Sequence, residues 1–306
     1  IKTSTKSLSG KETMNKHLSN SHRILGPGGL IAQHLSGYEF RPQQLQMAEA
    51  VSSALRSNAH LIAEAGTGVG KSFAYLIPAI ELALEIDQPV VISTNTISLQ
   101  EQLIHKDIPF LQEVLPYPFT AVLAKGRGNY LSRRRLNSLL AYERGIFETK
   151  AEVEEVARIV KWVSTTSDGS KADIEPQPMP EIWDRVVSDR DNCLGHQCPT
   201  YNTCFYFKAR ARMHEAHLLI VNHHLLFSDL AIRKSNPYAA VLPDYKYLII
   251  DEAHHLEAAA TEHASLAFSN VRVKRFLDLL CNRQMTGGLL VRFRAEHLIP
   301  LVDEIR

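Results

Sequence analysis

The sequence Ala65-Gly66-Thr67-Gly68-Val69-Gly70-Lys71-Ser72 decides the fold class of this chain. It follows a short apolar run at residues 60–63 and opens a stretch of helical character at 71–86. Glycines let the backbone curl so that its N–H groups face a phosphate, and the helix N-terminus adds its dipole. The pattern predicts a phosphate-binding loop in which Lys71 reaches the β- and γ-phosphates of a nucleotide and Ser72 binds Mg²⁺. Ala65 replaces the first glycine of the common pattern.

Short apolar runs recur on both sides of this loop. Several are rich in β-branched residues, as strands buried on both faces of a sheet are. They lie at 60–63, 89–93, 121–123, 218–221 and 247–250. Candidate helices alternate with them, at 42–56, 71–86 and 98–114. The alternation predicts an α/β fold with a parallel sheet, interrupted between about 125 and 215 by an insertion.

Composition narrows the class of protein. The chain has 306 residues, of which 45% are hydrophobic and 22% charged, which indicates roughly two folded domains and excludes disordered and fibrous proteins. No run approaches the roughly 18 apolar residues of a membrane span, and the first twenty residues lack a secretion signal. We therefore expect no membrane contact and a cytoplasmic location. The net charge of +1 does not by itself indicate a nucleic-acid partner.

A second acidic motif, Asp251-Glu252-Ala253-His254, directly follows the apolar run at 247–250. Acids at the carboxyl end of a buried strand lie where a metal ion beside the phosphate loop would be. Asp251 would hold Mg²⁺, and Glu252 would orient and activate an attacking water. The alternative is that the two carboxylates cap the next helix.

Four further segments accompany these motifs. Arg41-Pro42-Gln43-Gln44 lies some twenty residues before the loop, and a motif of hydroxyls and amides begins at Ser93. Lys125-Gly126-Arg127-Gly128-Asn129-Tyr130-Leu131 opens the insertion, and Val221-Asn222-His223-His224-Leu225-Leu226 precedes the acids. Together the motifs resemble superfamily-two helicases of the DEAH-box type, and more closely the DinG/YoaA branch of XPD-like iron-sulfur DNA helicases.

The resemblance implies a RecA-like P-loop NTPase core, and ATP with Mg²⁺ as its ligands. It assigns adenine reading to Gln44, supported by Arg41, and contacts with the DNA backbone to Thr94 and Thr96. It predicts the N-terminal portion of an ATP-dependent 5′-3′ DNA helicase that binds single-stranded DNA as a monomer. Protein partners are not indicated.

The expected domains follow from the same resemblance. The inserted domain would be mainly helical, and the helical arch domain would start near the end of the chain. The second motor domain, with its arginine finger, would be absent, so we expect nucleotide binding with little turnover and no unwinding. The expected ranges are a tail or linker at 1–24, the first motor domain at 25–124 and 216–256, the iron-sulfur-type insertion at 125–215, and the arch start at 257–306.

Three of the four cysteines cluster as Cys193-x4-Cys198-x5-Cys204. The resemblance makes them three of the four thiolates of a [4Fe-4S] cluster, and it puts the fourth at position 132, where this chain has serine. A hydroxyl is a poorer ligand for such a cluster. An engineered replacement, a natural loss, and a cluster completed by Ser132 or water remain open. So do an empty site and a zinc site that includes His196.

Basic and aromatic residues flank the cysteines and suggest a path for a single strand, because phosphates meet cations and bases stack on rings. We expect Arg127, Asn129, Tyr130 and Arg133 to contact DNA. A nucleotide-gated, redox- or partner-responsive binding module without unwinding activity is the alternative function. A P-loop metabolic kinase is disfavoured because the acidic motif and the segment from Ser93 would have no task in it.

Overall fold

The computed structural model describes residues 3–5, 14–66, 68–142, 149–236, 240–264, 273, 276–277, 280–281 and 289–305. The chain divides into two compact units, residues 1–259 and 260–306. Among the described residues, no helix combines the length and the apolar character needed to cross a membrane.

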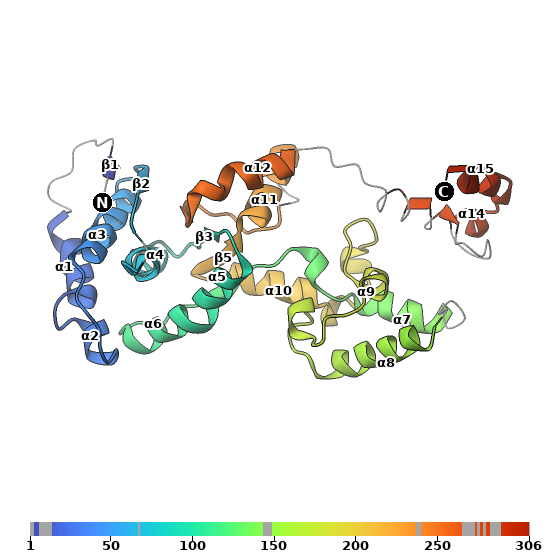
Figure 1. Cartoon of the computed structure of the whole chain (residues 1–306), viewed down its shortest axis with the longest axis horizontal. Coiled ribbons are helices and arrows are strands. Elements are labelled where there is room, and N and C mark those ends of the chain that lie inside the picture. The colour runs from blue at the N-terminus through green and yellow to red at the C-terminus, as the bar shows by residue number, and fades with distance from the viewer. Residues whose placement is uncertain are drawn as a thin grey trace. The chain divides into compact units, whose positions relative to one another are not determined.

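A four-stranded parallel sheet forms the centre of the first unit (Figure 1). Its order is β4 (Ala121–Leu123), β5 (Leu218–Asn222), β3 (Val90–Thr94) and β6 (Tyr247–Ile250). In register, Val90 of β3 lies opposite Leu218 of β5 and Tyr247 of β6. Because all four strands run in the same direction, the residues after β3 and β6 meet at one edge of the sheet. The mixed α/β fold with a parallel sheet, predicted from the sequence, is confirmed.

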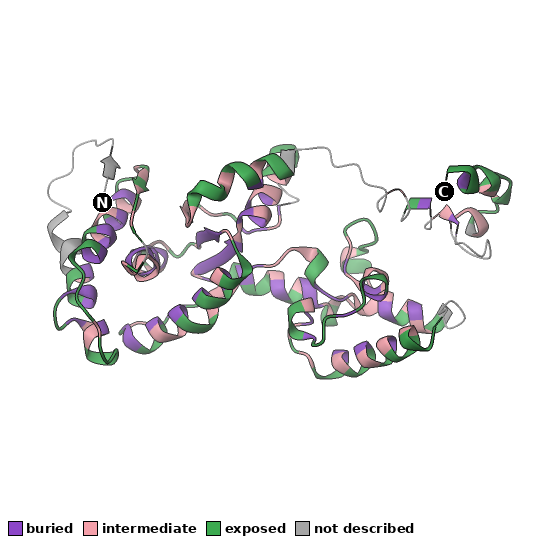
Figure 2. Cartoon of the chain, in the orientation of Figure 1, coloured by how far each residue is buried: buried purple, intermediate pink, exposed green. Residues whose placement is uncertain are grey.

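The central strands β3 and β5 of this sheet are buried, as Figure 2 shows, whereas the edge strands β4 and β6 are half-buried. One face supplies Val90, Ile92, Leu218 and Ile220 to the large core that includes the helices around the phosphate loop. The other face supplies Val91, Leu219 and Val221 to a second core. Alternate residues of a strand point to opposite faces, so continuous apolar runs are what a sheet covered on both sides requires.

Two of the three helices predicted before residue 257, at 42–56 and 71–86, have the predicted bounds. The helix predicted at 98–114 is divided, because Ile108 N–H donates to the carbonyl of Leu103 five residues earlier and makes a π-helical turn at Leu103–Asp107. Pro109, which has no N–H and cannot bond to the carbonyl of His105, follows this turn. The helices are α1 (Met14–Leu25), α2 (Leu30–His34), α3 (Pro42–Arg56), α4 (Lys71–Ile86), α5 (Ile97–Gln102), α6 (Ile108–Val114), α7 (Arg133–Tyr142), α8 (Lys150–Thr165), α9 (Pro180–Val186), α10 (Phe205–His214), α11 (His223–Ser235) and α12 (Leu256–Ala264).

Two features differ from the sequence-based expectations. Helix α1 begins inside the range 1–24, for which a tail or linker is expected, and Ile24 is fully buried in the main core. Strand β2 (Leu61–Ala63) pairs antiparallel with β1 (Thr3–Thr5) and lies outside the four-stranded sheet. Ile62 is 78% exposed, so this strand is not buried on both faces.

The range 125–215 contains a core of its own. Tyr130 and Leu131 begin it, and Trp183, Phe205 and Tyr206 supply its largest rings. In the second unit, Leu277, Cys281 and Val302 are buried together. The described helices of that unit are α14 (Leu289–Arg292) and α15 (Ile299–Ile305). The sequence also predicts a helix at 271–281, most of which lies outside the described residues.

Candidate functional site

The predicted phosphate loop joins β2 to α4. Gly68 and Gly70 have φ angles of +79° and +82°, in the left-handed region that favours glycine. At Gly70 an added Cβ would also collide with the side-chain amide of Gln44. Lys71 is the first residue of α4, so the helix N-terminus lies directly at the loop. This is the geometry that a bound phosphate group uses.

The other loop residues leave the outer side of the loop open. A Cβ added at Gly66 or Gly68 would meet no atom within 4 Å. Ala65 is half-buried and packs against the main core, which explains why a methyl group is accepted where the common pattern has glycine. Val69 is also half-buried. Thr67, a further predicted loop residue, lies outside the described residues.

Arg41 and Gln44 lie against this loop. Gln44 is 3% exposed, and its Nε2 donates to the carbonyl of Gly70 at 2.9 Å. Its Oε1 accepts from the hydroxyl of Tyr38 at 3.2 Å. Arg41 Nη1 donates to the carbonyl of Gly68 at 2.5 Å. Both side chains therefore hold the loop in shape here, and the adenine-reading role of Gln44 stays a prediction.

The acidic motif meets the loop at the carboxyl end of β6. Asp251 N–H donates to the carbonyl of Ser93 at 2.8 Å and so continues the bonding between β6 and β3. Glu252 then turns into the left-handed region at φ +52°. Its Oε1 lies 2.8 Å from Nζ of Lys71. The fold thus joins the two motifs, which are far apart in the sequence, by an ion pair.

The two neighbouring acids have opposite pKa shifts. Burial raises the pKa of Asp251, and the adjacent negative charge of Glu252 raises it further. The hydrogen bond from Lys71 lowers the pKa of Glu252. Glu252 is therefore held as an anion beside Lys71, whereas ionised Asp251 is short of positive charge. A divalent cation at Asp251 would supply that charge.

Two residues that the sequence analysis did not single out complete this site. Tyr75, one turn after Ser72 on α4, is 2% exposed and donates to Oδ2 of Asp251 at 3.3 Å. Asp107, in the π-helical turn, is 6% exposed and accepts from Nε2 of Gln102 at 3.4 Å, and its charge adds to the effect of burial in raising the pKa of Tyr75. Two features of the sequence could have pointed to these residues. Tyr75 lies three residues after Ser72, on the same face of a helix, and Asp107 is an acid within the apolar stripe of the helix predicted at 98–114.

The donor set at this edge of the sheet fits Mg²⁺. The hydroxyl of Ser72 and the carboxylate of Asp251 are hard oxygen ligands, and Tyr75 donates to Asp251 at 3.3 Å. Mg²⁺ is bound in proteins by one or two such ligands together with substrate phosphates and water. Ser72 and Asp251 would therefore hold the ion, and the phosphate loop would lie beside it.

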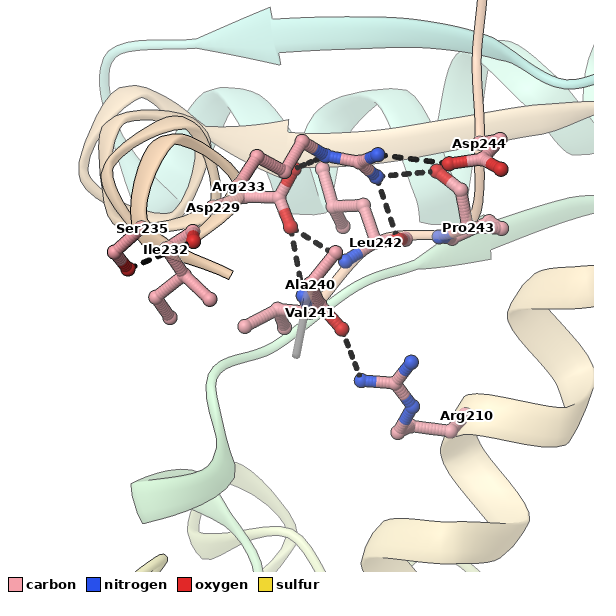
Figure 3. A network of polar contacts seen from close by, with 10 residues as sticks. All are labelled: Arg210, Asp229, Ile232, Arg233, Ser235, Ala240, Val241, Leu242, Pro243 and Asp244. Atoms are coloured by element: carbon pink, nitrogen blue, oxygen red, sulfur yellow. Dashed lines mark hydrogen bonds and ion pairs between the residues drawn. The ribbon is translucent and has the colours of Figure 1, made fainter. Parts of the chain in front are cut away.

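A buried ion-pair network holds the loop that leads into β6 (Figure 3). Asp229 on α11 is fully buried, and its Oδ1 accepts from the N–H groups of Val241 and Leu242 at 2.7 and 2.8 Å. Its Oδ2 accepts from Nε of Arg233 at 2.5 Å. Arg210 on α10 donates to the carbonyl of Ala240 at 2.8 Å. The start of the strand that carries the acids is thus tied to α11 and to the insertion.

The three clustered cysteines line one pocket, together with Ser132. Cys193 is exposed, and Cys198 and Cys204 are half-buried. Burial raises the pKa of the Cys193 thiol, but the N–H of Gly195 and the guanidinium of Arg127 outweigh this effect and lower the pKa. Ser132 lines the same pocket as the three cysteines, and its role in a cluster site stays a prediction.

The donor set of the pocket does not fit a four-thiolate cluster. Ser132 precedes α7, and its Oγ accepts from the N–H of Arg135 at 3.4 Å, as a helix cap does. Within the part of the chain that the structure describes, no three His, Cys, Asp or Glu side chains are arranged to hold a metal ion. His196, the fourth ligand of the zinc alternative, stacks on Tyr201 with ring centroids 4.4 Å apart.

The predicted DNA contacts fall into two groups. Thr96 and Asn129 are exposed, whereas Thr94 is fully buried. Thr96 caps α5, with its Oγ1 accepting from the N–H of Leu99 at 3.2 Å. Its exposed position at a helix N-terminus is compatible with a phosphate contact. Thr94 hydrogen-bonds to the carbonyl of Thr96 at 3.4 Å and supports this turn.

The second group lies in the insertion and is mostly occupied by internal contacts. Tyr130 is 1% exposed, so its ring is not available to stack on a base, and this prediction needs correction. Arg133 lies over the ring of Phe205 at 4.4 Å and donates to the carbonyl of Val163 at 3.4 Å, which gives it an internal packing role. Arg127 covers the ring of Tyr206 at 3.8 Å and remains half-buried.

Comparison with known proteins gives matches over both parts of this site. A family model described as DEAD/DEAH box helicase matches residues 41–134, and one described as DEAD_2 matches residues 179–273. The chain is 36% identical over 241 residues to the ATP-dependent DNA helicase YoaA of Haemophilus influenzae, and 38% identical over 267 residues to the ATP-dependent helicase DinG of Mycobacterium tuberculosis. The chain belongs to the DinG/YoaA-type helicases.

The matched ranges include the residues that form the site. The first range holds the phosphate loop and Ser132, and the second holds the cysteines and the acidic motif. The two alignments cover 78% and 80% of this chain, but only 37% and 39% of those helicases. A third relative, at 34% identity, is the 3′-5′ exonuclease DinG of Bacillus subtilis, with 76% of this chain and 24% of the relative aligned. The chain thus spans less than two-fifths of the length of these relatives.

Proposed function

We propose that this chain binds and hydrolyses ATP as part of a DNA helicase. The observation that carries the proposal is the ion pair of Lys71 with Glu252, 2.8 Å long, beside Asp251 at the end of β6. It joins a phosphate-binding loop to two carboxylates at the edge of a parallel sheet, which is the arrangement that phosphoryl transfer by P-loop enzymes uses.

Each residue of the site has a task in this reaction. The backbone N–H groups of the loop receive the phosphates, and Lys71 leaves Glu252 for the phosphate oxygens when ATP binds. Glu252, released from Lys71, orients the attacking water and accepts its proton. Ser72 and Asp251 hold the metal ion. Mg²⁺ held by these two residues would supply positive charge against the charge that develops on the phosphates.

Single-stranded DNA is the proposed substrate, and movement along it is proposed to run 5′ to 3′, as the family resemblance implies. Thr96, Asn129 and Arg127 are the predicted contacts that remain available, and they would bind the sugar-phosphate backbone without reading sequence. We further propose a monomer in the cytoplasm. The 306 residues alone are expected to turn over ATP slowly and not to unwind DNA.

The cysteine pocket is the proposed place of the iron-sulfur cluster, with Cys193, Cys198 and Cys204 as three ligands. No step of the mechanism above depends on it. The lowered pKa of the exposed Cys193 favours a second candidate function, a redox-responsive binding module, because thiolates are the reactive form of cysteine.

The test compares the wild-type chain with Glu252→Gln. We expect the variant to bind a fluorescent ATP analogue in Mg²⁺ within about threefold of wild type, and to lose at least tenfold in its residual hydrolysis rate. Single-stranded DNA should bind to both proteins, with an affinity that falls steeply as salt rises. Absence of nucleotide binding by the wild type would contradict the proposal. DNA binding that is insensitive to salt would favour the second candidate.

A further inference from the structure

Ser93, near the end of β3, is hydrogen-bonded on both sides at the edge of the sheet where the acidic motif lies. On the side of β6, its carbonyl accepts from the N–H of Asp251 at 2.8 Å. On the side of β5, its Oγ lies 2.7 Å from Nδ1 of His223, which follows that strand as the first residue of α11. The side chains of Ser93 and His223 are fully buried. Ser93 thus joins the carboxyl ends of three neighbouring strands.

Packing alone does not explain a histidine at position 223. One ring nitrogen is used by Ser93, but Nε2 is buried and has no hydrogen-bond partner among the described residues. A buried polar atom without a partner costs free energy, and an apolar side chain of similar size would avoid this cost. The bond to Ser93 is therefore the feature that distinguishes histidine from an apolar residue at this position.

The segment that follows Ser93 is the turn with the predicted DNA contacts. Thr94 is fully buried and donates to the carbonyl of Thr96 at 3.4 Å, and Thr96 is exposed. Ser93 therefore lies between the turn that would meet a phosphate of DNA and Asp251, which would hold Mg²⁺. Energetic coupling between sites is carried by contiguous hydrogen bonds and packed elements of this kind.

We propose that His223 is a positioning residue that, through Ser93, couples DNA contact at residues 94–96 to the binding of nucleotide with Mg²⁺ at Asp251. By its bond to Ser93, the ring limits the positions open to the end of β3, so that a DNA contact which fixes the turn also fixes the acid. The inference rests on the proposed binding of ATP with Mg²⁺ and of single-stranded DNA. Coupling between two ligands is reciprocal and commonly changes each affinity by about 5- to 150-fold.

The experiment measures how single-stranded DNA changes the affinity of the 306-residue chain for a fluorescent ATP analogue in Mg²⁺. In wild type, we expect a saturating oligothymidylate to tighten nucleotide binding about fivefold or more. The double variant with Ser93→Ala and His223→Leu removes both partners of the bond. In this variant we expect the effect of DNA to fall to about onefold, while nucleotide affinity without DNA stays within about twofold of wild type. Because both partners become apolar, the denaturant midpoint of unfolding should stay near that of wild type.

Two further variants separate coupling from a structural role. His223→Asn keeps a hydrogen-bonding group at the position of Nδ1 and should retain most of the coupling. The matched control is a similar pair at the amino ends of β4 and β5, where Oγ1 of Thr120 lies 2.8 Å from Nδ1 of His217. His217→Leu breaks that pair and should leave the coupling unchanged. Ser93→Ala alone repeats the test if the double variant does not fold.

Three outcomes would overturn the inference. The first is an unchanged effect of DNA in the folded double variant or in Ser93→Ala. The second is an equal loss of nucleotide affinity with and without DNA, which a merely structural role predicts. The third is wild-type protein that binds both ligands without any effect of one on the other, which would leave the proposed function standing. If wild type does not bind nucleotide or DNA, the proposed function fails, and the inference with it.

Discussion

The nucleotide site and the cysteine pocket differ in how completely this chain supplies their parts. At the nucleotide site, several side chains have a partner that holds them: Gln44 and Arg41 bond to the loop, Lys71 pairs with Glu252, and Tyr75 contacts Asp251. At the pocket, three thiols and a serine share one cavity, and the serine hydroxyl is used as a helix cap. The fourth thiolate that the family resemblance predicts is a hydroxyl in this chain.

The difference has a physical basis. The nucleotide site depends on backbone geometry and on contacts within the main core, so its shape is set by folding alone. A metal cluster depends on the identity of each donor atom, and exchange of one sulfur for oxygen changes the bonding without changing the fold. The insertion keeps its own core around Trp183 and Phe205, independent of that ligand.

The largest effect is expected when the ion-pair network that holds the loop before β6 is disrupted. Arg233→Ala would leave the fully buried carboxylate of Asp229 without its cation, and should lower the free energy of unfolding by about 3 to 5 kcal/mol. Denaturant unfolding measures this change. Arg56→Ala, which breaks a pair with the exposed Glu85, is the control and should cost less than about 1 kcal/mol. Similar costs for both variants would show that the network does not hold the loop before β6.

The next prediction concerns a variant that should change nucleotide affinity at the phosphate loop but not iron content at the cysteine pocket. Lys71→Ala should weaken binding of ATP with Mg²⁺ about 100-fold, because a charge-assisted contact to phosphate is worth up to about 3 kcal/mol. Iron content should not change. Lys106→Ala removes an exposed lysine near the site and serves as the control. An equal loss in both variants would mean that general positive charge, and not the loop lysine, binds the nucleotide.

Ser132→Cys is the converse variant, because it should change iron content at the cysteine pocket but not nucleotide affinity. Restoring a thiolate should raise the bound iron of anaerobically purified protein to about four per chain, with broad absorption in the visible region, and leave nucleotide affinity unchanged. Ser138→Cys, on the same helix α7, is the matched control and should not gain iron. Four irons in the wild-type protein would show that the oxygen ligand, or water, already completes the cluster.

The smallest effect concerns pH. The pKa of Glu252 is lowered by Lys71, so the pair stabilises the fold above the ordinary glutamate pKa of about 4.3 and loses this contribution as the pH falls toward the lowered value. Because both side chains are more than a quarter exposed, the contribution should stay below about 1 kcal/mol. Unfolding measured between pH 6 and pH 3 should show a steeper loss for wild type than for Glu252→Gln. Equal slopes would contradict the ion pair.

Much of this structure could be predicted from the sequence, because buried parallel strands and glycine-rich turns have strong local patterns. The strands at 89–93, 218–221 and 247–250 lie within one residue of their observed bounds at each end. The place of Asp251 and Glu252 at the carboxyl end of β6 follows from the apolar run before them, whereas Lys71 follows β2, which lies outside the parallel sheet. The role of position 132 in the cysteine site comes from the family resemblance and stays a prediction.

The rest depends on packing that no local pattern encodes. Burial of Tyr130, the internal contacts of Arg133 and the antiparallel pairing of β2 all arise from tertiary contacts. The π-helical turn was missed because its five-residue step looks like an ordinary amphipathic helix in the sequence. The burial of Asp107 near Tyr75, which this turn brings about, was therefore missed as well.

The most direct test of the central claim is an equilibrium titration of iron-free wild-type protein with ATP and Mg²⁺. A complete nucleotide site beside an incomplete cysteine pocket predicts one nucleotide bound per chain, with the same affinity in iron-free protein and in iron-loaded Ser132→Cys. Nucleotide binding that appears only when iron is present would contradict the account, because the two sites would then not be independent.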